Sequence, residues 1–141
     1  MKLEIELVNI EPLPLNQVFA TDFRTKKRFK SKKYAQFISN VNGQLRNFKS
    51  QINKFNKKYS IDEHYIVTNY KFYYPILLKS GRKISKTSKD ASNLIKTIED
   101  VIFKQLTADD SQVISVSAIK IHSENIRIYA EIELKNIKHI I

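Results

Sequence analysis

The sequence of 141 residues contains no cysteine and only two glycines, Gly43 and Gly81. Without cysteine there is no disulfide framework, no thiolate nucleophile and no cysteine-based zinc site. The two glycines stand alone, so no glycine-rich loop can cradle a phosphate, and no serine lies in a nucleophile elbow. The three histidines are scattered, without the spacing of zinc ligands. Enzymes that depend on any of these devices are therefore excluded.

Long apolar runs are absent as well. None approaches the ~18–20 residues that span a bilayer, and Glu4 and Glu6 interrupt the apolar N-terminal stretch, unlike a signal peptide. We therefore expect a soluble, cytoplasmic protein with no membrane partner. The length fits one domain, residues 1–141, and the 42% of apolar residues are enough to build a core.

Positive charge is in large excess. The 25 Lys and Arg residues against 14 Asp and Glu residues leave a formal net charge of +11. Self-repulsion at this charge favours a polyanionic partner, of which nucleic acid is the commonest and an anionic membrane surface the alternative. Residues 16–60 alone carry twelve basic residues against one acid, Asp22, a net of +11.

Two basic runs, in residues 25–33 and 80–89, are predicted to be loops that contact phosphates. The alternative for each run is a basic surface that is only solvated. The candidate DNA-binding residues are Lys26, Lys27, Arg28, Lys30, Lys32, Lys33, Arg82, Lys83, Lys86 and Lys89.

Apolar periodicity predicts four strands. Residues 2–7 and 126–134 alternate apolar and polar side chains with the period of a half-buried strand. Residues 65–74 are β-branched and aromatic and end before a proline, and residues 112–120 form the remaining strand. Residues 122–125 are expected to be a hairpin connection between the last two strands.

The same reasoning predicts two amphipathic helices. In residues 34–55 apolar side chains recur at three- and four-residue spacing, and Gly43 marks a point where this helix kinks or ends early. Residues 90–106 form the second helix, with an apolar face that contains Leu94 and Ile98. The element order β–α–β–α–β–β, without an internal repeat, predicts an α+β fold. Its small mixed or antiparallel sheet carries both main helices on one face.

Acidic residues gather in the second helix and in the turn that follows it. They are Asp90, Glu99, Asp100, Asp109 and Asp110, which Lys96 and Lys104 offset to a net of −3. Carboxylates repel a phosphate unless a cation lies between them, and hard oxygen ligands suit Mg²⁺ or Mn²⁺. Lys96 shares the polar face of the helix and is placed to stabilise developing negative charge. The alternative is that Asp90 caps the helix and that Asp109 and Asp110 are turn residues.

The order of these residues resembles the signature of the RusA-like Holliday junction resolvases. The matching run is KDASNLIK at residues 89–96, followed by Asp100 and by DDSQV at residues 109–113. The family begins this helix with Asp-x-Asp-Asn-Leu and a Lys, has an Asp four residues later, and follows the helix with an Asp-Asp-x-x-Val turn. Residues 14–16, residues 32–34 and the final two strands add weaker support, so the resemblance follows nearly the whole chain.

The resemblance implies a small α/β homodimer that cleaves branched DNA, such as a four-way junction, with Mg²⁺ (or Mn²⁺ as a substitute) and no small-molecule cofactor. The catalytic roles transfer to Asp90, Lys96 and Asp110, and the metal ligands to Asp90, Asp109 and Asp110. Supporting positions are Ser92, Asn93 and Asp100, with Ser92 standing where the family has a second Asp. Because the family is frequent in phages and prophages, the expected setting is the cytoplasm of a bacterial host or phage-infected cell.

Three functions follow from these patterns. The first is a Mg²⁺-dependent, structure-selective endodeoxyribonuclease that acts in DNA recombination and repair. The second is a junction-binding module of the same fold that does not turn over, an alternative that Ser92 keeps open. The third is a basic RNA-binding or ribosome-associated domain, which would explain the charge of +11 but not the acidic group.

Overall fold

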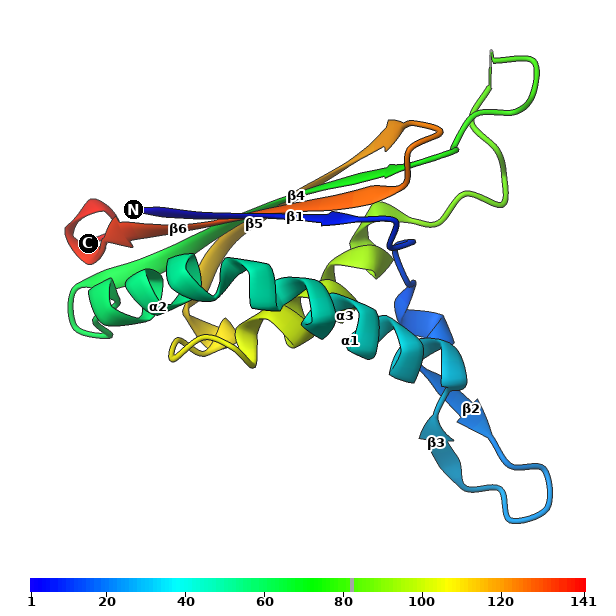
Figure 1. Ribbon diagram of the computed structural model, residues 1–141, viewed down its shortest axis with the longest axis horizontal. Helices are drawn as coiled ribbons and strands as arrows, with labels where there is room; N and C mark the ends of the chain where they lie inside the picture. Colours follow the sequence, from blue (N-terminus) through cyan, green and yellow to red (C-terminus); the bar gives the residue numbers. More distant parts are fainter. Residues whose placement is uncertain (82) are drawn as a thin grey trace.

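The computed structural model describes residues 1–81 and 83–141, and in it a four-stranded sheet carries all three α-helices on one face (Figure 1). The strands are β1 (Lys2–Val8), β4 (His64–Tyr74), β5 (Val113–His122) and β6 (Arg127–Asn136). The helices are α1 (Lys32–Leu45), α2 (Lys49–Lys58) and α3 (Ala91–Phe103). The predicted α+β class, with a mixed sheet and helices on one face, is confirmed.

The sheet has the strand order β1-β6-β4-β5. Strand β6 pairs antiparallel with both β1 and β4, whereas β4 and β5 are parallel. Alternation in β1, β4 and β6 places one set of side chains under the helices, as the period of a strand requires. These core side chains include Leu3, Ile5, Leu7, Ile66, Tyr70, Phe72, Ile128, Ala130 and Ile132.

The prediction that residues 122–125 form a hairpin connection is wrong, because β5 and β6 are not neighbours in the sheet. Strand β4 lies between β5 and β6, so the connection crosses the end of β4 instead of joining two paired strands. Helix α3 returns the chain so that β5 runs parallel to β4, at the edge of the sheet. Strand β6 takes a central position because its alternating apolar side chains are buried between two partners.

The first amphipathic helix is interrupted, as its glycine suggested, but not at the glycine. Gly43 lies inside α1, and the interruption is a short 3-10 turn, Arg46–Phe48, between α1 and α2. The apolar stripe continues through it, since Leu45, Ile52 and Phe55 are all buried. The stripe therefore depends on packing against the sheet, and the tighter turn absorbs the change of direction.

The first basic run, residues 25–33, was predicted to be a loop, but only residues 25–27 lie in a loop. Residues 28–30 form a strand and residues 32–33 begin α1. Strands β2 (Phe19–Thr21) and β3 (Arg28–Lys30) pair antiparallel, and Ser31 then caps α1 by accepting a hydrogen bond from the Tyr34 N–H. Figure 1 shows this hairpin projecting away from the sheet. The second basic run is a loop in its described part, with one bridge between Leu77 and Ile84, and it projects from the same end of the molecule (Figure 1).

Among the helices that the structure describes, none is both long and apolar enough to cross a bilayer.

Candidate active site

Helix α3 carries most of the predicted site residues. Its apolar face, which includes Leu94, Ile98 and Ile102, is fully buried against the sheet. Asp90 precedes the helix in an extended conformation, and its carbonyl accepts a hydrogen bond from the Asn93 N–H at 3.0 Å. The polar side of α3 is thereby held toward solvent along its length.

Lys96 lies at the centre of the acidic group. Its ammonium is 2.8 Å from an Asp100 carboxylate oxygen, one helical turn on, and 3.0 Å from an Asp110 carboxylate oxygen. Asp110 begins the 3-10 turn Asp110–Gln112, which leads into β5. The structure thus brings together three residues, Lys96, Asp100 and Asp110, that the sequence separates by up to fourteen positions.

These contacts keep both partners charged. Hydrogen bonds from Lys96 hold the pKa of the Asp110 carboxyl below its ordinary value. The same pairing, with Asp100 the larger cause and Asp110 the next, raises the pKa of Lys96. Near neutral pH Lys96 and Asp110 are therefore both charged, and both side chains are partly exposed.

A cavity of about 230 Å³ opens beside this ion pair. It is lined by Tyr34, Asp100, Phe103, Lys104, Ala108, Asp109 and Asp110. Asp109 is exposed, and its carboxylate accepts a hydrogen bond from the Ser111 hydroxyl at 2.7 Å. Two adjacent carboxylates, Asp109 and Asp110, thus share one cavity with the Asp100 carboxylate.

Glu99, a member of the acidic group, forms a buried pair between α3 and β4 that was not predicted as part of the site. The Tyr70 hydroxyl of β4 donates a 2.7 Å hydrogen bond to Glu99, which is only 9% exposed. Burial raises the pKa of Glu99, and the charges of Asp110 and Asp100 add to the rise. The sequence signal was present in the alternation of β4, but it could not show that Glu99 turns inward.

Asp90 lies apart from this cluster. Ten residues of helix separate it from Asp100, which corresponds to about 15 Å along the axis. Ser92 and Asn93, in the first turn of α3, lie at the Asp90 end as well. Within residues 1–81 and 83–141, no three His, Asp or Glu side chains are grouped closely enough to hold a metal ion.

Lys89 fixes the chain immediately before Asp90. Its ammonium donates hydrogen bonds to the Glu11 carboxylate at 2.8 Å and to the Pro12 carbonyl at 2.7 Å. Its carbonyl accepts hydrogen bonds from the Tyr74 hydroxyl at 3.2 Å and from the Lys120 ammonium at 2.7 Å. Although Lys89 was predicted to bind DNA, its side chain is only 19% exposed and is engaged in positioning the start of α3.

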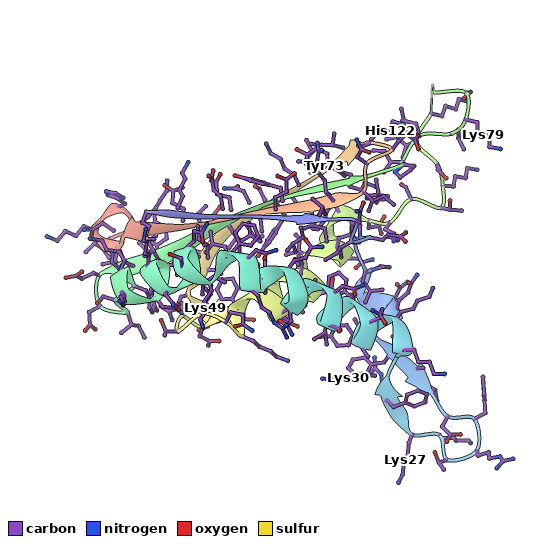
Figure 2. The ribbon with its side chains drawn as sticks, viewed as in Figure 1. Lys27, Lys30, Lys49, Tyr73, Lys79 and His122 are labelled. Carbon is purple, nitrogen blue, oxygen red and sulfur yellow. The ribbon has the colours of Figure 1, made fainter. Side chains whose placement is uncertain are left out.

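The other predicted DNA-binding residues that the structure describes are exposed. Lys27 and Lys30 point into solvent from the hairpin in Figure 2, and Lys32 and Lys33 line a cavity of about 660 Å³ at the start of α1. The remaining exposed members are Lys26, Arg28, Lys83 and Lys86, and Arg82 lies outside the described residues.

On the helix-free face of the sheet, acidic side chains are paired with basic side chains or with a tyrosine hydroxyl. Glu4 and Glu131 both accept hydrogen bonds from the Tyr129 hydroxyl, at 2.9 and 3.2 Å. Lys2 lies 3.6 Å from Glu131, and Arg127 lies 3.7 Å from Glu6. Opposite charges therefore pair on this face, whereas the two projecting segments at one end of the molecule carry an excess of basic side chains.

A sequence profile of one protein family, described as endodeoxyribonuclease RusA, matches residues 10–133. No curated protein matches the chain. The matched span includes the projecting hairpin, all three α-helices and the acidic group of α3.

Proposed function

Because the chain belongs to the endodeoxyribonuclease RusA family, we propose that it is a Mg²⁺-dependent endodeoxyribonuclease that cuts Holliday junctions as a homodimer. The observation that carries the proposal is the position of Lys96, whose ammonium lies between Asp100 and Asp110 beside a cavity. The carboxylates beside this cavity outnumber the ammonium groups and would repel a phosphate unless a cation lay between them.

The donor set around the cavity fits a divalent metal ion. Asp109 and Asp110 are adjacent in sequence, and both line the cavity. Mg²⁺ is commonly held by only one or two carboxylates together with the substrate's phosphates, so a larger protein cage is not required. We assign these two residues as its ligands. By the family motif Asp90 is a further catalytic carboxylate, but it lies at the start of α3, about 15 Å along the helix axis from Asp100, and does not line this cavity. When bound, Mg²⁺ would supply Lewis-acid charge at the phosphodiester.

The protein's own residues would divide the remaining work. Asp110 stays ionised because Lys96 lowers the pKa of its carboxyl, so it can bind a cation or accept a proton from water. Lys96 stays protonated, because both carboxylates raise its pKa, and can donate hydrogen bonds to a phosphate oxygen in the transition state. Tyr74 and Lys120 donate hydrogen bonds to the Lys89 carbonyl and so fix the backbone immediately before Asp90.

The basic segments would bind the arms of the junction. The logarithm of the binding constant falls linearly with the logarithm of the salt concentration. Each phosphate that a Lys or Arg neutralises makes this salt slope steeper by ~0.9. Two protomers would present two sites, which suits two symmetric cuts. A junction-binding module without turnover is the second candidate, because Ser92 replaces a carboxylate of the family motif.

The test is a nicking assay on a synthetic four-way junction beside a linear duplex of the same sequence, with Mg²⁺, with Mn²⁺ and with EDTA. We expect paired, metal-dependent cuts near the branch and none in the duplex. Asp110→Asn and Asp90→Asn should each lower the rate by at least about 100-fold and leave junction affinity unchanged or higher, because a negative charge facing DNA is removed.

Asp62→Asn is the matched control, since Asp62 is exposed in the turn before β4. It should leave both rate and affinity unchanged. Tight junction binding without cuts in either metal would replace the nuclease with the binding module. Equal affinities for junction and duplex would contradict the proposed substrate.

A further inference from the structure

Phe23, at the tip of the projecting hairpin, is 96% exposed. Burying a phenylalanine side chain stabilises a protein, so its position at an exposed tip forgoes that stabilisation. Two further phenylalanines on the hairpin, Phe19 and Phe29, are 44% and 49% exposed. The hairpin projects away from the sheet in Figure 1, so these three exposed rings form aromatic surface outside the core.

The tip that carries Phe23 has a defined backbone. The Asp22 N–H donates to the Lys27 carbonyl at 2.9 Å, and the Lys26 N–H donates back to the Asp22 carbonyl at 2.7 Å. The Asp22 side chain accepts a hydrogen bond from the Arg24 N–H at 2.9 Å, which closes an Asx turn around Phe23. Lys26 adopts a left-handed conformation with φ of 55°, which completes the reversal. Phe23 is thus held outward on an ordered turn.

Cations surround this aromatic side chain. Between residues 19 and 30 the hairpin carries five basic residues against Asp22, a net of +4. The Arg28 guanidinium lies 4.3 Å from the centre of the Phe19 ring, so that cation and aromatic groups are already paired along the hairpin. Basic side chains that follow a phosphate backbone, combined with exposed aromatic rings, are the means by which proteins hold unpaired nucleotides.

From this geometry we propose that Phe23 stacks on an unpaired or unstacked base of the DNA while the hairpin's cations contact the neighbouring phosphates. The inference rests on the proposed function, since it takes branched DNA as the ligand. In a continuous duplex each base face is covered by the next base pair, whereas at a branch point base faces become accessible. Phe23 therefore contributes to the preference for branched over linear DNA, which phosphate contacts alone cannot provide.

The chain contains no tryptophan, so Phe23→Trp creates a single fluorescent reporter at the tip. Stacking on a base should quench its emission when a four-way junction or a single-stranded oligonucleotide is added in EDTA. A linear duplex should leave the emission unchanged. Because residues 21–30 are all exposed, the substitution should leave folding intact.

Phe23→Ala tests the energetic contribution. Junction affinity should fall by about 5- to 150-fold, the factor that corresponds to ~1–3 kcal/mol for one stacked base, and duplex affinity should stay within about 2-fold. Ile61→Ala is the matched control, because Ile61 is a similarly exposed apolar residue outside the hairpin and should change neither affinity. Lys27→Ala should weaken junction and duplex binding alike and reduce the salt slope by ~0.9.

The outcomes separate this inference from the proposed function. If the wild-type chain does not prefer the junction, the proposed substrate is wrong, and the emission of the Phe23→Trp variant with a single-stranded oligonucleotide alone decides whether the tip stacks on bases. If the junction is preferred but Phe23→Ala binds it normally, or loses junction and duplex affinity equally, the stacking inference is overturned and the hairpin is only a phosphate contact.

Discussion

Tyr70→Phe tests whether the buried hydrogen bond to Glu99 supports the helix that carries the site. Tyr70 is 1% exposed and Glu99 is 9% exposed, so water cannot readily replace the lost hydroxyl. A hydrogen bond to a charged group contributes about 1.5–3 kcal/mol, and a buried acceptor left unpaired costs a similar amount. We therefore expect the free energy of unfolding to fall by about 1.5–3 kcal/mol at pH 7.

The loss should depend on pH in a defined direction. Burial raises the pKa of Glu99, while the Tyr70 hydroxyl opposes that rise. Glu99 thus contributes stability below its unfolded pKa that is lost as pH rises through the higher folded pKa. Without the hydroxyl the folded pKa rises further, so the deficit of Tyr70→Phe should grow with pH across this range. Because glutamine does not titrate, the stability of Glu99→Gln should lack the pH dependence that Glu99 contributes.

The measurement is urea unfolding of each variant at several pH values, with the midpoint falling at an unchanged slope. Tyr73→Phe is the matched control, because Tyr73 lies on the helix-free face of the same strand, as Figure 2 shows. It should change the free energy of unfolding by less than about 0.5 kcal/mol. A Tyr70→Phe loss as small as the control's, or one that shrinks as pH rises, would refute the reasoning.

Lys89→Ala should lower the free energy of unfolding by about 1–3 kcal/mol, because the Lys89 ammonium donates hydrogen bonds to Glu11 and Pro12. Lys86→Ala, as the control, should leave the free energy of unfolding unchanged and weaken DNA binding. Equal losses of stability in the two variants would contradict the positioning role of Lys89. Ser31→Ala should cost about 0.5–2 kcal/mol in chemical unfolding, since Ser31 caps α1 and its hydroxyl also donates to the Gln17 carbonyl at 2.6 Å. Gly43→Ala should stabilise the protein by about 0.5–1 kcal/mol, because among the described residues a Cβ there meets nothing within 4 Å; a lower thermal midpoint would argue that Gly43 is needed.

Much of the fold was predictable from local patterns. Leu3, Ile5 and Leu7 alternate in β1, and Leu94 and Ile98 share one face of α3, and all five are buried as their spacing predicts. A strand or helix repeats its geometry every two or 3.6 residues, so the sequence alone reports which face a side chain occupies. The charge excess and the acidic motif could also be identified from the sequence, because they depend only on residue type and order.

The hairpin shows where local patterns are insufficient. Residues 25–33 read as a basic loop because no apolar period runs through them. The strand β3 that forms there is only three residues long and all of it is exposed, so its pairing with β2 leaves no alternation to detect. The same exposure places Phe23 at the tip, a feature that composition could not distinguish from a core phenylalanine.

By itself, then, the sequence determined the main strands and helices, their buried faces, the charge distribution and the order of the motif residues. Only the tertiary structure decided that β6 lies between β1 and β4, that Lys96 joins Asp100 to Asp110, and that Lys89 positions the start of α3. These features arise from contacts between residues distant in the chain, and their energies depend on packing and desolvation that no short window of sequence contains.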